Sequence, residues 1–260
     1  MNLKNPDHPG HPFVVFPAID LLDGKSVRLQ KGARGSASVV HPDPFEQLEN
    51  YAAAGAQWVH LVDLNSAFND APSHSGRRST RQIVSQIVAE GKLKLQVGGG
   101  VRSRADALAL LEMGVERVVI GTWAVQAPHE VCALAAEYPE LIVVGLDTVD
   151  GLVAVQGWTE KSQLSVEEFG KKIFEQGVRH ALYTEVERDG MLTGIDVAAA
   201  ARLHAATGLL ILGSGGVRDV TDIEALSQTA GIWGVITGKA LAAGSLLLED
   251  ALKYERKTTF

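Results

Sequence analysis

The chain has 260 residues and a formal net charge of −7, with 46% apolar and 21% charged residues. This is ordinary globular composition, and the length suits one α/β barrel of about 250 residues as well as two smaller domains. The absence of any run of Lys or Arg argues against a nucleic-acid or membrane surface, and no apolar run reaches the roughly 20 residues of a membrane span.

The single cysteine, Cys132, excludes an intramolecular disulfide and indicates a reducing, cytoplasmic setting. It lies in a helical pattern, where we expect it to be buried. The first residues, MNLKNPDHPGHP, lack the apolar stretch of a signal peptide. Their Pro, Gly and His content predicts a flexible tail over residues 1–12, followed by a single domain over residues 13–260.

Short apolar runs and amphipathic segments alternate along the chain. Runs such as WVHLVD and LIVVGLD are apolar on both sides of the strand alternation, which is typical of parallel strands buried on both faces. Strands are predicted near 13–20, 57–63, 93–97, 116–121, 141–147, 179–184, 209–213 and 232–236. Helices are predicted near 43–55, 79–91, 103–114, 128–137, 165–176, 196–206, 218–231 and 241–255. Eight such units favour a closed (β/α)8 TIM barrel over an open doubly wound sheet.

The two halves of the chain are similar to each other. FPAIDLLDGK (16–25) matches VVGLDTVDGL (143–152) at an offset of 127, and GGVR (99–102) matches GGVR (215–218) at an offset of 116. The sequence therefore predicts a two-fold half-barrel repeat, with Asp20 and Asp147 ending strands on opposite sides of one mouth. The Asp-Gly pairs that follow these two residues predict hairpin turns.

Glycines recur at four strand ends in two matched pairs. Glycines at a helix start let the backbone approach a ligand, and backbone N–H groups bind phosphate without basic side chains. We therefore expect a bisphosphorylated substrate, held at both sides of the mouth, although the glycines could serve only to make tight turns. The expected phosphate-binding residues are Gly99, Gly100, Gly121, Thr122, Gly194, Gly215, Gly216, Gly238 and Lys239.

Two carboxylates on opposite sides of a mouth suit an acid–base reaction, because a catalytic acid and base must both reach the reacting carbon. Asp20 and Asp147 are the expected pair. The competing interpretations are helix capping, or a structural ion pair of Asp20 with Arg28 or Lys25. Thr184, at the end of the sixth strand, is expected to hydrogen-bond an acid–base group or a substrate hydroxyl.

Other polar residues near the mouth are expected to contact the substrate. Arg28 and Asp189 belong to this set, and Trp158 could stack on a flat heterocycle or pack against the barrel rim. Asp63 ends the second strand and is expected to play a supporting role.

Three kinds of site find no support in the sequence. The histidines show no metal-binding spacing, so no metal site is predicted, and His60 and His180 are expected in the core or at the rim. A GxSxG elbow with a partnered histidine is absent, and so is a GxGxxG fingerprint after the first strand.

The motifs FPAIDLLDGKSVRLQKG, QVGGGVRS, GLDTVDG, YTEVERDGMLTG and GSGGVRD together resemble the ProFAR isomerases of histidine biosynthesis, over residues 13 to 250. The resemblance implies an aldose–ketose isomerase that converts ProFAR to PRFAR by an Amadori rearrangement, with no metal or cofactor. It further implies that Asp20 is the general base, that Asp147 is the general acid and that Thr184 supports the acid.

The chain departs from the family pattern at DLNSA (63–67), where the family often has Asp-Leu-Asp-Gly-Ala. Three rival interpretations stay open. They are the cyclase subunit of imidazole glycerol phosphate synthase, an isomerase that also handles phosphoribosyl anthranilate, and an inactive barrel that binds a sugar phosphate. A monomer is expected, because a barrel of this size can close its own core.

Overall fold

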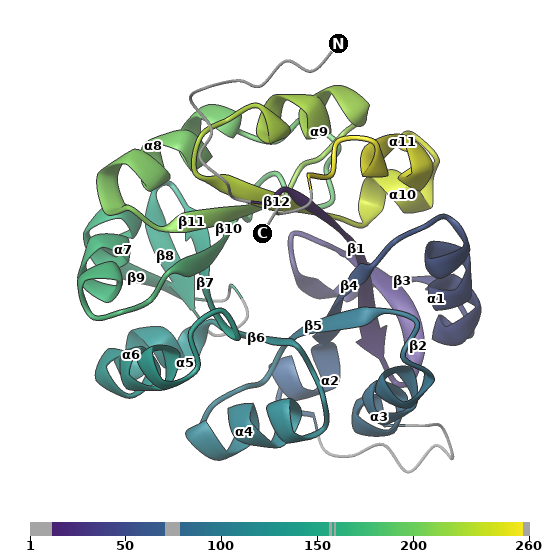
Figure 1. Ribbon diagram of the computed structural model, residues 1–260, viewed down its shortest axis with the longest axis horizontal. Helices are drawn as coiled ribbons and strands as arrows, with labels where there is room; N and C mark the ends of the chain where they lie inside the picture. Colours follow the sequence, from purple (N-terminus) through teal and green to yellow (C-terminus); the bar gives the residue numbers. More distant parts are fainter. Residues whose placement is uncertain (1–11, 71–78, 156–157, 159, 257–260) are drawn as a thin grey trace.

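The structure, a computed structural model, describes residues 12–70, 79–155, 158 and 160–256. Eight parallel strands of the described chain form a ring surrounded by helices (Figure 1). In ring order they are β1 (Val14–Leu22), β4 (Trp58–Asp63), β5 (Lys94–Gly98), β6 (Arg117–Ile120), β7 (Ile142–Val149), β10 (His180–Glu185), β11 (Leu210–Ser214) and β12 (Ile232–Thr237). Because β12 pairs with β1 and β7 pairs with β10, the ring is closed, and the predicted TIM barrel is confirmed. Most of the predicted tail lies outside the described residues.

Helices cover the outer face of the barrel (Figure 1). They are α1 (Pro44–Ala53), α3 (Thr80–Glu90), α4 (Arg104–Glu112), α6 (Pro128–Glu137), α7 (Val166–Glu175), α8 (Val197–Thr207), α9 (Val220–Ser227) and α11 (Leu248–Leu252). Three short helices directly follow barrel strands: α2 (Leu64–Ala67), α5 (Thr122–Gln126) and α10 (Lys239–Ala243). Among the described residues no helix is long and apolar enough to cross a bilayer.

The single helix predicted over 241–255 is wrong, because the segment forms two helices. Gly244 ends α10 in the left-handed conformation, with φ of 72°, and its N–H bonds the Ala240 and Leu241 carbonyls. A left-handed residue closes a helix, so the chain turns before α11 begins. The short helices α2 and α5 were not predicted at all, since four or five residues are too few to show a helical period.

Both Asp-Gly turns are hairpins, as predicted. Asp23 and Gly24 have φ of 51° and 72°, and Asp150 and Gly151 have φ of 52° and 75°, the pattern of type I′ turns. The first turn joins β1 to β2 (Lys25–Gln30), and the second joins β7 to β8 (Leu152–Val155).

Each hairpin is extended by a further antiparallel strand that sequence reasoning missed. These strands are β3 (Ala33–His41), which pairs with β2, and β9 (Glu160–Ser165), which pairs with β8. The sequence of β3, ARGSASVVH, has little apolar alternation because most of the strand is exposed. The same extension occurs once in each half, so the half-barrel repeat holds in three dimensions.

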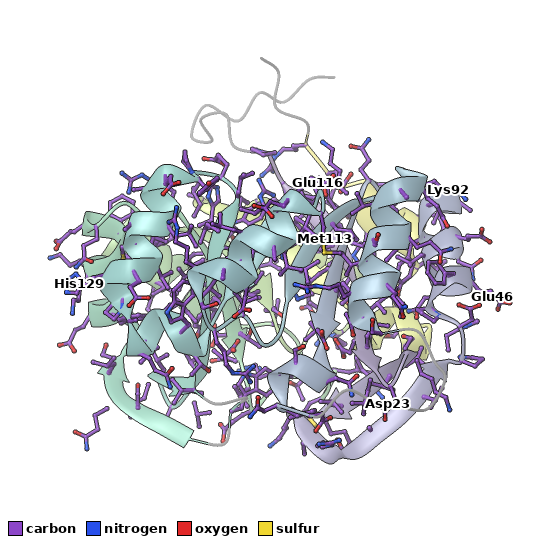
Figure 2. The ribbon with its side chains drawn as sticks, turned by 90° about the horizontal axis from the view of Figure 1, so that it is seen from below. Asp23, Glu46, Lys92, Met113, Glu116 and His129 are labelled. Atoms are coloured by element: carbon purple, nitrogen blue, oxygen red, sulfur yellow. The ribbon has the colours of Figure 1, made fainter. Side chains whose placement is uncertain are left out.

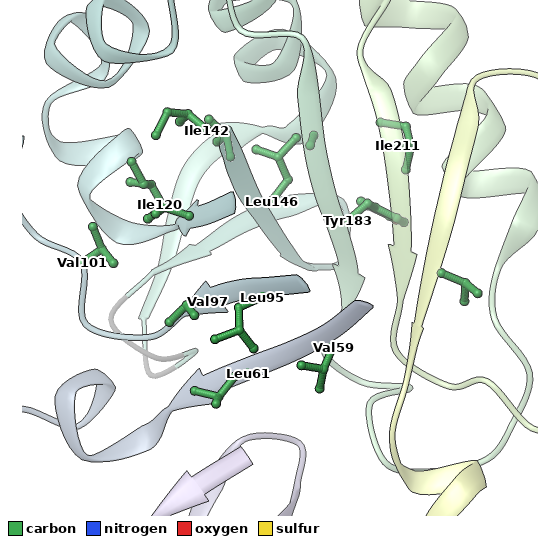
Figure 3. Packing of buried hydrophobic residues seen from close by; sticks show 14 of the residues in the cluster. Val59, Leu61, Leu95, Val97, Val101, Ile120, Ile142, Leu146, Tyr183 and Ile211 are labelled. Carbon is green, nitrogen blue, oxygen red and sulfur yellow. The ribbon is translucent and has the colours of Figure 1, made fainter. Parts of the chain in front are cut away.

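Side chains of the barrel strands alternate between two apolar clusters. One cluster lies between strands and helices, and Figure 3 shows Val59, Leu61 and Leu95 of this cluster on neighbouring strands. The other fills the barrel interior and includes Phe16, Leu182 and Trp233 among other residues. Burying a side chain of this kind contributes about 1.5–3 kcal/mol, so the strands are fixed from both faces. Cys132 is buried in the outer cluster, as predicted.

The amino-terminal end of the barrel is closed by a stack of aromatic and cationic side chains. The Arg117 guanidinium carbon lies 4.8 Å from the ring centre of Trp58 and 4.5 Å from that of Trp233. Burial lowers the pKa of Arg117, and Glu140 opposes this. His180 is buried beside Trp233, with Nε2 3.2 Å from Glu140.

In Figure 2, Glu116, just before β6, and Asp23, in the first turn, lie at opposite ends of the barrel. The mouth is therefore at the end away from this stack.

Replacing Arg117 with Met keeps the apolar stem but removes the cation between the two indole rings. We expect a loss of about 2 kcal/mol in the free energy of unfolding, measured by urea denaturation, because each desolvated cation–π contact contributes about 1–2 kcal/mol. Arg104→Met is the control, since Arg104 makes an exposed ion pair with Glu137 and such pairs contribute less than about 1 kcal/mol. Equal losses in the two variants would contradict a closing role for the stack.

Candidate active site

A cavity of about 750 Å³ opens at the carboxyl ends of the barrel strands. We call it the mouth cavity. The predicted site residues that line it are Asp20, Arg28, Gly99, Gly100, Gly121, Thr122, Asp147, Trp158, Thr184, Asp189, Gly215, Gly216, Gly238 and Lys239. Gly194 is predicted with them but does not line the cavity. Its N–H donates to the carbonyl of Gly216 at 2.9 Å, so Gly194 contacts the cavity through this lining residue.

The two expected catalytic carboxyls belong to diametrically opposed strands. Asp20 lies on β1 and Asp147 lies on β7, with three barrel strands between them on either side of the ring. Both side chains line the mouth cavity. The arrangement that the repeat predicted is therefore present.

Asp20 is held by a buried cation. Arg28, on β2, places Nη1 3.1 Å from the Asp20 carboxylate, and its side chain is only 6% exposed, against 23% for Asp20. The guanidinium also donates to the Ala18 and Val27 carbonyls. The ion pair considered as an alternative to catalysis thus exists, and it places a buried cation beside the Asp20 carboxylate at the cavity.

The Arg28 guanidinium also lies beside Gly238, a glycine of the predicted phosphate site. A Cβ at Gly238 would lie 2.7 Å from the guanidinium, so only glycine admits this approach. Within the described part of the chain, Arg28 Nε is buried without a hydrogen-bond partner. An anion near Gly238 would find this cation next to it.

The hydrogen-bond partners of the Asp147 carboxyl are neutral. Thr184 lies beside it in the β7–β10 register. Burial raises the pKa of Asp147, and hydrogen bonds from the Trp158 indole and the Thr184 hydroxyl offset part of that rise. The net shift is toward the protonated form relative to an ordinary aspartate, which is the direction that a proton donor needs.

A third carboxyl, Asp189, shares the cavity. Its pKa is raised to about 7 because it is buried, with further contributions from the charges of Asp20 and Asp147, and Arg28 opposes the shift. Asp189 was expected only as a substrate contact. Nothing in the motif RDG reveals that it stands close enough to both other carboxyls for their charges to interact.

The glycine motifs predict phosphate binding at the starts of the helices that follow them, but other helix starts are more suitable. The glycine motifs GGGVR and GSGGVR precede α4 and α9, but both of those helices begin with side-chain caps of their own: Ser103 accepts from the Asp106 N–H, and Asp219 accepts from the Thr221 N–H. Asp106 accepts from the Arg102 N–H at 3.1 Å, and Asp222 accepts from the Arg218 N–H at 2.8 Å. By contrast, no side chain caps α5 or α10, which start at Gly121 and Gly238 on the rim of the cavity. Uncapped helix starts are the suitable anion sites.

The paired glycines have a packing role of their own. Gly99 and Gly215 have φ of 95° and 86°. A Cβ at Gly99 would lie 2.4 Å from the Asp63 carbonyl oxygen, and one at Gly215 would lie 2.9 Å from the Glu185 carbonyl oxygen. Each glycine therefore lets its loop pack onto the end of the preceding barrel strand, which agrees with the alternative that the glycines serve to make tight turns.

The departure at DLNSA is explained by two neighbouring acids. Asn65 accepts from the Asp23 N–H at 2.9 Å and donates to the Asp23 carboxylate at 3.0 Å and to Asp70 at 3.4 Å. An aspartate in its place would repel both carboxylates. Asp63 caps α2 by accepting from the Ser66 N–H, which is a supporting role of the kind expected.

His60 lines the cavity from inside the barrel. It is buried and hydrogen-bonded to Gln96 at 2.9 Å, as expected for a core histidine. Burial, with help from Arg28, lowers its pKa to about 3, so the imidazole is neutral at physiological pH. Across the described ranges, no three or more His, Cys, Asp and Glu side chains gather in an arrangement able to hold a metal ion.

Comparison with known proteins gives a consistent result. A family model described as "Histidine biosynthesis protein" matches residues 14–246. A protein of a Sulfurovum species, named 1-(5-phosphoribosyl)-5-((5-phosphoribosylamino)methylideneamino) imidazole-4-carboxamide isomerase, is 41% identical over 92% of this chain and 97% of its own length. Proteins of the same name from Rhizorhabdus wittichii and Geobacillus thermodenitrificans are 43% and 40% identical, over 94% and 93% of this chain and 98% and 97% of theirs.

The raised pKa of Asp189 predicts a pH-dependent stability. In the unfolded chain the carboxyl ionises near 3.8, whereas in the folded chain it ionises near 7. Folding stability from this group is thus fully present below about pH 4 and is lost as the pH rises to about 7. At pH 8 we expect Asp189→Asn to have a free energy of unfolding, measured by urea denaturation, up to about 4 kcal/mol above that of the unmodified chain. At pH 5 the difference should be much smaller. Asp150→Asn, at an exposed turn position, should show no such difference. A pH-independent gap for Asp189→Asn would contradict the shift.

Proposed function

Because the chain belongs to the histidine biosynthesis protein family, we propose that it is the isomerase that converts the aminoaldose ProFAR to the aminoketose PRFAR by acid–base catalysis. The observation that carries the proposal is the pair Asp20 and Asp147, on opposed strands of one cavity with unequal surroundings. One carboxyl has a cationic partner and the other has neutral hydrogen-bond donors. A base and an acid need that difference at the same pH.

The substrate is anchored at its two ends. One phosphate lies at the start of α5, near Gly121 and Thr122, and the other lies at the start of α10, near Gly238 and Lys239. Both starts line the cavity and have no side-chain cap. Binding both ends holds the reacting sugar carbon between the carboxyls, and such positioning can lower the barrier by about 7–11 kcal/mol.

The reaction then proceeds in two proton transfers. Asp147, protonated, donates to the furanose ring oxygen, and the C–O bond opens to give a protonated Schiff base. Asp20, ionised, removes the proton from C2, and the electron pair moves to form the enolamine, which tautomerises to the ketose. Thr184 and Trp158 hold the Asp147 carboxyl, and Arg28 holds Asp20. Each proton transfer contributes about 10²–10⁴-fold.

Asp189 is a second candidate for the donor. Its pKa near 7 leaves about half of the population protonated at neutral pH, and its position exposes it to the charges of both other carboxyls. If Asp189 donates, Asp147 would act on Asp189 rather than on the substrate. The two possibilities differ in which Asn variant abolishes the first step.

Two rival functions are less well supported than the isomerase. The relatives reported above are named as isomerases, not as cyclase subunits. Whether the protein also isomerises phosphoribosyl anthranilate is tested by the turnover assay described below. We also propose that the protein works as a cytoplasmic monomer, which agrees with the closed barrel and the lone, buried Cys132.

The test is turnover of ProFAR by the purified chain without glutaminase or ammonia, followed by absorbance. We expect conversion of ProFAR but not of phosphoribosyl anthranilate. Asp20→Asn should lower kcat by about 10²–10⁴-fold, and the same loss in Asp147→Asn or Asp189→Asn identifies the donor. Asp150→Asn, in the exposed hairpin turn, is the control with unchanged activity. Binding of ProFAR without turnover would show that the chain is an inactive barrel, and full activity of Asp20→Asn would remove it as the base.

A further inference from the structure

Trp158 lies where loops from both half-barrels meet over the mouth cavity. It stands between β8 and β9 of the second half, and its backbone has φ of 72°, a conformation that a tryptophan rarely adopts. Such a conformation persists only where surrounding contacts hold it. One close contact of this side chain comes from the first half of the chain.

The seat of the indole is the turn between β2 and β3. Lys31 and Gly32 form this turn, with φ of 48° and 67°. A Cβ at Gly32 would lie 2.3 Å from Cε3 of the indole and 2.8 Å from Cζ3. The six-membered part of the ring therefore rests directly on the Gly32 backbone, and no other residue type leaves room for it.

The other end of the indole reaches the catalytic centre. Its N–H donates to the Asp147 carboxyl, together with the Thr184 hydroxyl. The same turn also touches the loop that carries the third acid, because the Lys31 N–H donates to the Asp189 carbonyl at 3.4 Å. The contacts thus run from Gly32 through Trp158 to Asp147.

We propose that Gly32 is a positioning residue for the reaction: it seats the Trp158 indole so that the indole N–H holds the Asp147 carboxyl. The first half-barrel thereby orients the carboxyl of the second half. This role rests on the proposed function and differs from a stacking contact with substrate, since it operates through Asp147.

The groups around Asp147 predict how the pH dependence of activity changes when the indole hydrogen bond is lost. Asp147 faces Thr184 on β10, Trp158, and Asp189 in the loop after β10, which itself senses Asp20 and Arg28. The indole hydrogen bond lowers the pKa of Asp147 against the effect of burial. Losing that bond raises the pKa, so an activity that needs the protonated acid declines at a higher pH.

The first test measures coupling by thermal unfolding and needs no activity. We expect Gly32→Ala to lower Tm by about 4 °C more than Gly244→Ala. Gly244 is the matched control, because its φ is 72° and a Cβ there would have no atom within 4 Å. In a Trp158→Ala background the obstacle is gone, so the extra loss should disappear. Equal decreases in Tm for Gly32→Ala and Gly244→Ala, or an extra decrease for Gly32→Ala that persists in the Trp158→Ala background, would contradict the packing of the indole on Gly32.

The second test measures the pH–rate profile. Gly32→Ala and Trp158→Phe should both move the falling limb upward by about half to one pH unit and lower kcat about tenfold, while Gly244→Ala leaves the profile unchanged. An unmoved limb in Gly32→Ala would refute the positioning role even if the seat exists. Absence of turnover in the unmodified chain would instead overturn the proposed function and leave the unfolding comparison valid.

Discussion

The site depends on one electrostatic constraint: two carboxyls in one cavity must differ in protonation at the same pH. A duplicated half-barrel supplies two equivalent acids, and equivalence alone would give them similar pKa values. The chain breaks it with the residues that follow. Asp20 has Arg28 as a buried partner, whereas the position 127 residues after Arg28 is Val155, which offers no charge. Asp147 is instead held by an indole and a hydroxyl, so burial keeps its pKa raised.

The remaining architecture serves to maintain these two surroundings. Apolar side chains on both faces of the strands fix the ring, and the Trp58–Arg117–Trp233 stack closes the end away from the chemistry. At the mouth, the side chains of Ser103 and Asp219 cap the starts of α4 and α9, while α5 and α10 begin without side-chain caps. Helix starts near the cavity are thus divided between those that side chains cap and those without a cap, where we propose that the phosphates bind.

Most of the barrel could be predicted from sequence because its signals are local and repeated. Continuous apolar strands, capped helices and two Asp-Gly turns each identify one element, and the internal repeat places Asp20 opposite Asp147. The strands β3 and β9 were missed because exposed strands lack apolar alternation. The contacts of Arg28 and Thr184 with the two acids were anticipated. The other surroundings of the site could not be predicted, since they depend on the approach of residues far apart in the chain. The contact of Gly32 with Trp158 joins residues far apart in the chain, and the charges that act on Asp189 come from three other elements.

The most direct measurement of the central claim is the ionisation of the two carboxyls themselves. Carbon-13 NMR of a chain labelled at the aspartate carboxyl carbons would follow each titration, with resonances assigned by their loss in Asp20→Asn and Asp147→Asn. The account predicts that the Asp147 resonance titrates above the ordinary value of 3.8. An Asp147 carboxyl that titrates at or below the ordinary aspartate value would contradict the division into acid and base.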